Sequence, residues 1–373
     1  MEPQKKEIIV VATQDVERTD VAEHQEAARG AENAHVMTLG SALRSHRKAI
    51  FWSAFLSLAL FMEGYQLVIV NSFFGQPQFQ EKYGDVVGPE GTRQISAAWQ
   101  TGLSNAALVG EIIGLAINSY VIDRFGYKKV YLADMVFIAL AIFPVFFAPN
   151  LGVLTFGMVL IGIPWGSLQT LSTSYAAEVC PIPLRAYLAS FVNMCWGMGI
   201  FLSSGIVRAT LPIQSEWAYR LPFAIQWAFP IPLFLIALFA PESPWWLQRN
   251  GRDEEAARAL RQLSDPCHWD EDKLQADLTL LRYTNALEST QANVSIKEPF
   301  QSHNRVRTET ACVVWATQWL CGNTLIGFAV LFLQRAGLSS SASFDFNLSM
   351  NSMYIVGTII SVSPSDYPPL SSD

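Results

Sequence analysis

Two glutamates stand inside long apolar segments of the chain, where a carboxyl group can take up and release a proton. Glu63 lies about 14 residues into the apolar run 50–72, and Glu111 lies about 13 residues into the run 98–121. At about 1.5 Å per helical residue, both positions are roughly 20 Å from one end of a bilayer-spanning helix. An ionised acid there costs roughly 2.5–3.5 kcal/mol on insertion scales, unless it pairs, faces a cavity or stays protonated. We interpret both as proton-coupling residues; the alternative is a protonated glutamate that only joins two helices.

Further polar and aromatic side chains in the apolar runs could bind a small polyhydroxy compound. Amide groups hydrogen-bond hydroxyls, and an indole ring can stack on a sugar while its N–H finds a partner. For Trp196 the alternative is packing against lipid or another helix, and Asp134, near the end of its run, is interpreted as interfacial or paired. The predicted substrate-binding residues are Tyr65, Gln66, Asn193, Trp196 and Gln318.

The elements that must position these groups are membrane helices. The chain is 51% hydrophobic and 15% charged, whereas a soluble chain is about a quarter charged. Apolar runs that approach the roughly 20 residues needed to span a bilayer predict an all-α membrane fold. Six runs lie in the first two thirds of the sequence, at 50–72, 98–121, 130–148, 151–176, 186–209 and 222–240, and two lie later, at 311–334 and 345–362.

The charges between the runs predict orientation and exclude several functions. Arg44, Arg47 and Lys48 precede the first run and place the N-terminus in the cytosol. A net charge of −7 argues against nucleic acid as a partner. The five cysteines show neither C-x-x-C nor zinc spacing, and no Walker, G-x-S-x-G or H-E-x-x-H motif is present. We therefore predict no enzyme activity, no catalytic residues, no cofactor and no metal.

Five motifs occur in an order that carries a family resemblance. They are Met62-Glu63-Gly64-Tyr65, Asp123-Arg124-Phe125-Gly126-Tyr127-Lys128-Lys129, Gly162-Ile163-Pro164-Trp165-Gly166, Glu178 seven residues before Arg185, and Pro241-Glu242-Ser243-Pro244-Trp245-Trp246-Leu247. Over about residues 50–360 the chain resembles the sugar porters of the major facilitator superfamily. Within that family it is similar to the fungal maltose and α-glucoside permeases.

The resemblance implies a monomeric multi-pass carrier, in the plasma membrane, that moves an α-glucoside such as maltose together with protons by alternating access. Its partners would then be a small sugar, protons and the lipid bilayer. The alternative is a membrane sugar sensor or regulator of the same fold that transports nothing. The resemblance also implies a cytosolic charge network that favours one conformation. Its expected members are Asp123, Arg124, Glu178, Arg185 and Glu242.

The chain departs from this family in two ways. Gln66 stands where an acid is common, which removes one proton-titrating group and weakens the expectation of proton coupling. The sequence also has room for only about eight of twelve helices, so we expect a truncated chain that does not transport by itself.

The expected organisation has five parts. They are a disordered cytosolic tail (1–48), an N-terminal six-helix half (49–241), a cytosolic loop with helices at about 253–263 and 270–287 (242–308), a partial C-terminal half with helices 7 and 8 (309–362), and an atypical tail (363–373). The sequon Asn347-Leu348-Ser349 is expected outside the cell, close to the membrane.

Overall fold

The computed structural model describes residues 39–87, 91, 93–264, 271–290 and 300–362. The predicted disordered tail therefore lies outside the described residues up to residue 38, and the predicted tail 363–373 lies outside them altogether. The chain divides into two compact units. We call Met1–Phe51, Ala177–Ala186 and Pro241–Arg305 the loop unit, and Trp52–Ala176, Tyr187–Ala240 and Val306–Asp373 the membrane unit.

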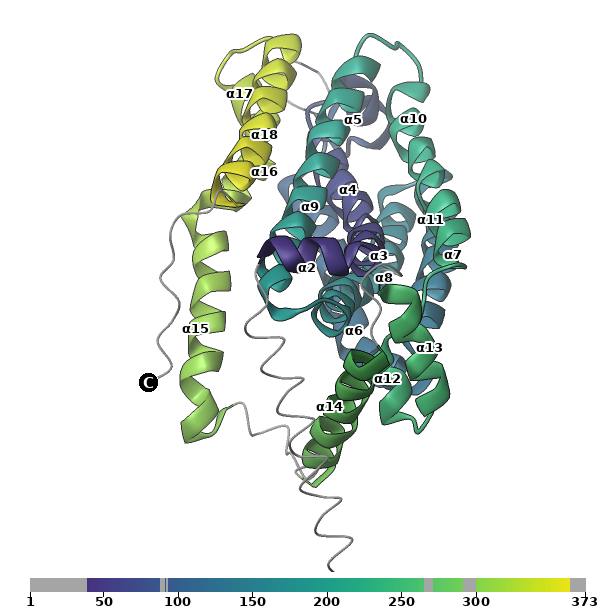
Figure 1. Cartoon of the computed structure of the whole chain (residues 1–373). Coiled ribbons are helices and arrows are strands. Elements are labelled where there is room, and N and C mark those ends of the chain that lie inside the picture. The colour runs from purple at the N-terminus through teal and green to yellow at the C-terminus, as the bar shows by residue number, and fades with distance from the viewer. Residues whose placement is uncertain (1–38, 88–90, 92, 265–270, 291–299, 363–373) are drawn as a thin grey trace, which may run out of the picture. The chain divides into compact units, whose positions relative to one another are not determined.

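Long apolar helices build the membrane unit (Figure 1). Within the described residues, six helical segments are long and apolar enough to cross a membrane, and each overlaps a predicted run. The first consists of α3 (Arg47–Ser57) and α4 (Ala59–Phe73), and the last of α10 (Trp217–Ile225), η1 (Gln226–Ala228) and α11 (Pro230–Ala237). The four between them are α6 (Ala97–Phe125), α7 (Tyr127–Phe146), α8 (Leu151–Val179) and α9 (Ile182–Thr210).

Glycines let pairs of these helices approach until their backbones touch. Gly110 of α6 lies against the backbone of Gly162 of α8, and Gly64 of α4 lies against the backbone of Trp196 of α9. In lipid there is little hydrophobic driving force for helices to associate, so close backbone packing between small residues supplies much of the attraction. These contacts therefore fix α4 against α9 and α6 against α8, the four helices that carry most of the predicted site residues.

Short turns connect the helices and limit how they can be arranged. Gly126, at φ 89°, separates α6 from α7 and adopts a conformation that other residues rarely reach. Between α4 and α6 the chain forms α5 (Pro77–Tyr83) and a small antiparallel ribbon, β1 (Val86–Val87) with β2 (Arg93–Gln94). In that ribbon Val86 pairs with Gln94 and Val87 with Arg93.

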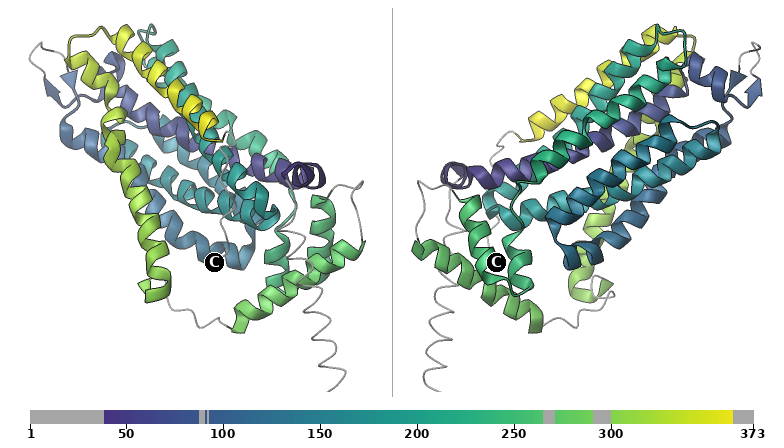
Figure 2. Two further views of the ribbon diagram at one scale, coloured as in Figure 1. Left: turned by 60° about the vertical axis from the view of Figure 1, so that its left-hand side comes forward. Right: turned by 90° about the vertical axis from the view of Figure 1, so that its right-hand side faces the viewer.

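The predicted seventh helix is interrupted. The run 311–334 falls on α15 (Ser302–Gln318), the π-turn η4 (Trp319–Asn323), α16 (Thr324–Gly327) and α17 (Ala329–Arg335). Gly322 causes the interruption because its φ of 103° is incompatible with a right-handed helix. The last described helix, α18 (Ser340–Val362), lies beside α9 in both Figure 1 and Figure 2.

The loop unit consists of short polar helices. It contains α2 (Leu39–Ser45), α12 (Pro244–Arg249), α13 (Asp253–Leu263) and α14 (Glu271–Thr290), and the last two lie at the helices expected from the sequence. Ion pairs join α13 to α14: Arg282 contacts Asp253 at 3.0 Å and Arg261 contacts Glu271 at 3.1 Å. All four side chains are about half exposed, so each pair contributes at most about 1 kcal/mol.

Candidate proton and substrate site

Glu63 lies inside the membrane unit with only half of its carboxyl group satisfied. The residue is 2% exposed, and its Oε1 accepts a hydrogen bond from Gln169 Nε2 of α8 at 2.6 Å. Its Oε2 is buried and has no hydrogen bond of ordinary geometry among the described residues, although the Trp196 side chain lies close enough to interact with the carboxyl group. A buried acceptor without a donor costs about 1–3 kcal/mol. The arrangement therefore leaves one oxygen of Glu63 ready to bind a proton.

Glu111 of α6 is the second carboxyl of this site. It is partly buried, and its Oε1 also lacks a partner among the described residues. The Glu63 and Glu111 carboxyls interact electrostatically. Gly166 of α8 contacts the backbone of Glu111, and this contact holds the main chain at that position. The structure thus brings together the two acids that the sequence analysis singled out.

Tyr65 and Gln66, one and two residues after Gly64 in α4, are both fully buried and hydrogen-bonded. The Gln66 oxygen accepts a hydrogen bond from Gln226 Nε2 of η1. The Gln66 Nε2 donates to the sulfur of Met158 at 3.0 Å. The Tyr65 hydroxyl donates to the carbonyl oxygen of Pro222 at 3.0 Å. Both side chains therefore connect α4 to neighbouring helices in this conformation.

The other predicted substrate-binding residues lie in α9 and at the end of α15. Asn193 is exposed, and the Trp196 ring lies 5.9 Å from the Tyr354 ring of α18 at an interplanar angle of 58°. The side chain of Gln318 lies outside the described residues. The structure brings Trp196 and Glu63 onto adjacent helices, because Gly64 contacts the Trp196 backbone. Tyr354 is a neighbour that the sequence analysis missed.

The predicted charge network is divided between the two units. In the loop unit, Glu178 accepts hydrogen bonds from Ser243 Oγ and from Arg249 Nη2. Glu242 Oε1 accepts from the backbone N–H of Ser243 at 3.1 Å, and Arg185 Nε donates to the carbonyl oxygen of Cys180 at 3.3 Å. Asp123 and Arg124 belong to the membrane unit, where Arg124 donates to the Tyr120 hydroxyl at 3.1 Å. Ser243 and Arg249 are contacts of Glu178 that sequence spacing does not indicate.

Comparison with known proteins identifies the family of this chain. The family model described as "Sugar (and other) transporter" matches residues 52–367. The chain belongs to this transporter family. Its relatives are permeases and transporters rather than enzymes, as the sequence analysis predicts.

Two yeast permeases are among the relatives of this chain. It is 38% identical over 354 residues to the alpha-glucosides permease MPH3 of Saccharomyces cerevisiae, covering 93% of this chain and 58% of the relative. It is 36% identical over 351 residues to maltose permease MAL31 of the same organism, covering 92% and 57%. The chain therefore spans less than two thirds of the length of these relatives.

Solved structures confirm the major facilitator fold. The proton:xylose symporter XylE bound to 6-bromo-6-deoxy-D-glucose superposes with a TM-score of 0.68 at 17% identity, over 84% of this chain and 69% of that one. A partially occluded inward-open XylE from E. coli gives 0.64 at 18% identity, over 84% and 70%. The family model, together with six helical segments in the described residues that are long and apolar enough to cross a membrane, shows a multi-pass membrane protein.

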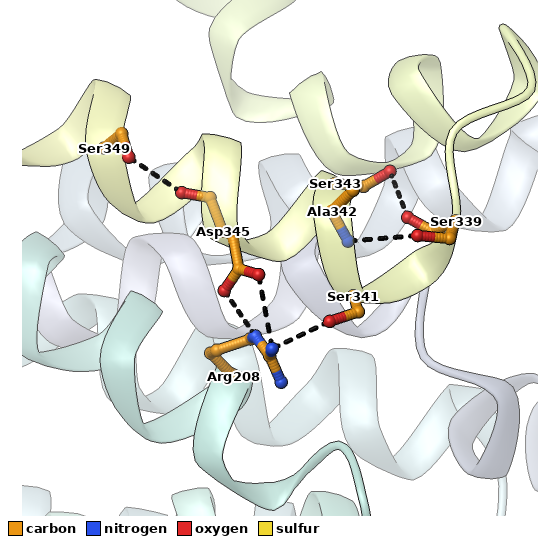
Figure 3. Close-up of polar contacts among 7 residues, drawn as sticks. All are labelled: Arg208, Ser339, Ser341, Ala342, Ser343, Asp345 and Ser349. Atoms are coloured by element: carbon orange, nitrogen blue, oxygen red, sulfur yellow. Dashed lines mark hydrogen bonds and ion pairs between the residues drawn. The ribbon is translucent and has the colours of Figure 1, made fainter.

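One set of contacts between α9 and α18 was not predicted from the sequence. Arg208 of α9 makes a two-pronged ion pair with Asp345 of α18, at 2.6 and 3.2 Å, and Arg208 Nη2 donates to Ser341 Oγ at 2.7 Å (Figure 3). Further along, Asn351 donates to Ser204 Oγ at 2.7 Å. In the sequence Arg208 is only one charge near the end of the run 186–209, and its partner lies 137 positions away.

The same helix changes the interpretation of the sequon. Asn347 is 5% exposed and lies inside α18, rather than in a loop. Glycan attachment requires an accessible acceptor, so this sequon is structural in the described conformation.

Proposed function

We propose that this chain is part of a proton-coupled carrier for α-glucosides such as maltose, which works by alternating access. The observation that carries the proposal is the pair of acids Glu63, which is buried, and Glu111, which is partly buried, each with one buried carboxyl oxygen that has no hydrogen bond of ordinary geometry among the described residues. The yeast relatives named as alpha-glucosides and maltose permeases support the substrate class.

The pair suits proton coupling for an electrostatic reason. Two neighbouring carboxylates in a medium of low polarity repel strongly, so the pair holds at least one proton when no cation is near. Entry of water or a sugar hydroxyl on one side of the membrane changes how well the ionised form is solvated. Glu63, tied to Gln169, and Glu111 would then bind the proton on one side and release it on the other.

The remaining predicted residues take supporting roles in this proposal. Asn193, Trp196 and Gln318 would contact the sugar, and Tyr65 and Gln66 would reach it by exchanging their helix contacts for hydroxyl groups. The charge network of Asp123, Arg124, Glu178, Arg185 and Glu242 would bias the protein toward one conformation. We also propose a monomer in the plasma membrane with a cytosolic N-terminus, and the five-part organisation described above.

Uptake of labelled maltose tests the proposal. Two proteins are expressed in a yeast strain that lacks the yeast's own maltose permeases. One is the chain of 373 residues, and the other is the longest product of the gene that encodes this chain. We expect the longest product to take up maltose faster at acidic external pH and to acidify the cell interior. Glu63→Gln and Glu111→Gln should abolish that pH dependence, whereas Glu81→Gln, at an exposed position of α5, should leave it unchanged.

Three outcomes would contradict parts of the proposal. Unchanged pH dependence in both Glu63→Gln and Glu111→Gln would remove them as proton-coupling residues. Maltose binding without uptake would favour the sugar sensor. Uptake by vesicles that contain only the printed chain would refute the expectation that it does not transport by itself.

A further inference from the structure

A third acid, separate from the Glu63 and Glu111 pair and partly buried, lies among α6, α7 and α8. Asp134 of α7 contacts Ser167 Oγ of α8 through its Oδ2 at 2.6 Å. The same Ser167 hydroxyl lies 2.8 Å from Oδ1 of Asn118 of α6. The Asn118 amide nitrogen in turn donates to the carbonyl oxygen of Ser167 at 3.1 Å and to the Thr170 hydroxyl. Polar groups from three membrane helices therefore meet at one serine hydroxyl.

The number of hydrogens at this hydroxyl decides the protonation of the acid. Ser167 Oγ carries one hydrogen, yet it faces two acceptor oxygens, Asn118 Oδ1 and Asp134 Oδ2. If that hydrogen points to Asn118, the contact with Asp134 needs a hydrogen from the carboxyl group. We propose that Asp134 is a proton-binding site: its carboxyl is protonated, and the bound proton completes the chain Asp134 to Ser167 to Asn118.

The orientation of the Asn118 amide supports this assignment. If the amide were turned around, its nitrogen could donate to Ser167 Oγ, and an ionised Asp134 could accept from Ser167. The amide oxygen would then face the Ser167 carbonyl oxygen at 3.1 Å, which places two acceptors against each other. The Thr170 hydroxyl now donates to the Ser167 carbonyl oxygen at 3.0 Å. With the amide turned around, it would have to donate to the Asn118 oxygen instead and would lose that bond. The unturned amide satisfies every contact, and it requires the proton.

The surroundings of Asp134 also favour the neutral form. The residue is the eighth of α7, which places it about 10 Å along a membrane-spanning helix. Its neighbours in the described residues are the Ser167 hydroxyl and the phenol of Tyr131, whose own oxygen is buried without a hydrogen-bond partner there. Neither neighbour is a cation, so an ionised Asp134 would have no opposite charge among them to offset the cost of a charge within a membrane-spanning helix.

The inference gives this proton a role different from that of the coupling pair. The carboxyl proton of Asp134 would donate to Ser167 Oγ, whose own hydrogen donates to Asn118 Oδ1, and this chain joins α7 to α8 and α6. The protonated oxygen of Asp134 therefore has a hydrogen-bond partner, whereas Glu63 and Glu111 each keep a buried oxygen without one among the described residues. Asp134 accordingly retains its proton while the pair exchanges one. This site does not depend on the proposed sugar transport.

Infrared spectroscopy of the purified full chain in nanodiscs at neutral pH tests the proton directly. In a Glu63→Gln/Glu111→Gln background, exposed acids are ionised and we expect one remaining protonated-carboxyl C=O band. Adding Asp134→Asn, which keeps a hydrogen-bond donor at this position, should remove that band and leave the melting temperature nearly unchanged. Ser167→Ala should keep the band but shift it to higher frequency, because the carboxyl loses its hydrogen-bond acceptor.

Two results would overturn the proposal. The absence of a protonated-carboxyl band in the Glu63→Gln/Glu111→Gln background would mean that Asp134 is ionised and the Asn118 amide is turned around. A band that persists unchanged after Asp134→Asn would assign the proton to another group. Asp134→Glu, which moves the carboxyl by one methylene, should restore a band at a different frequency if the Asn variant alone fails to fold.

Discussion

The contact between α6 and α8 makes Gly162→Ala a sharp test of the packing on which the site depends. A Cβ on Gly162 would lie 3.0 Å from Gly110 Cα and closer still to the carbonyl oxygen of Ala107. Both are backbone atoms, so no side chain can rotate away to make room. One helix would have to move, and with it Glu111, whose backbone is held by Gly166.

The expected magnitude is the difference between two opposing effects. Replacing glycine by alanine inside a helix favours the helix by about 0.8–1 kcal/mol. Overpacking of a tight contact costs about 1–3 kcal/mol, and a contact between two backbones lies at the upper end of that range. We therefore expect Gly162→Ala to destabilise the protein by about 1–2 kcal/mol. Gly102→Ala of α6 is the matched control, because its Cβ would meet nothing within 4 Å and it should be neutral or slightly stabilising.

The assay is reversible unfolding of the purified protein from mixed micelles by increasing SDS, followed by tryptophan fluorescence. The two alanine variants should move the midpoint in opposite directions. Similar midpoints for both variants would refute the reasoning, because the helix propensity would then dominate and the close approach of α6 to α8 would not exist.

Three further predictions concern the polar contacts. Ser243→Ala should destabilise the loop unit by about 0.5–2 kcal/mol, measured by hydrogen exchange, because the Ser243 oxygen caps α12 by accepting from the Trp246 N–H. A hydrogen bond from Lys82 lowers the pKa of Glu216, so their pairing stabilises the protein above the usual carboxyl range and is lost as pH falls through the lowered value. The melting-temperature advantage of wild type over Glu216→Gln should accordingly vanish in acid. Asn347→Gln should leave electrophoretic mobility unchanged after expression in yeast, because the buried asparagine carries no glycan.

The sequence predicted the features that depend on composition along the chain. A long apolar run can satisfy its backbone hydrogen bonds in a membrane only as a helix, and six of the eight predicted runs overlap segments in the described residues that are long and apolar enough to cross one. The acids Glu63 and Glu111 were found because a charge in such a run is costly and rare. The ordered motifs predicted the family, and the family model confirms it.

Features that depend on contacts between distant segments could not be predicted in the same way. Composition does not reveal that Gly322 turns to φ 103° and divides the predicted seventh helix. The ion pair of Arg208 with Asp345 joins residues 137 positions apart, and no local spacing encodes it. The sequon at Asn347 matched a local pattern, but the burial of Asn347 in the folded chain determines whether a glycan can be attached.

Gln66 shows how a departure from the family pattern fits the site. Its amide accepts from Gln226 and donates to the Met158 sulfur, two roles that an ionised carboxylate could not combine. An acid here would also add a titrating group to α4 three residues, or about one helical turn, after Glu63. Two acids at that spacing would repel each other, and the pair would retain a proton in a region of low polarity. With glutamine at this position, the hydrogen bonds of residue 66 stay independent of protonation, and in the proposed mechanism proton exchange falls to Glu63 and Glu111.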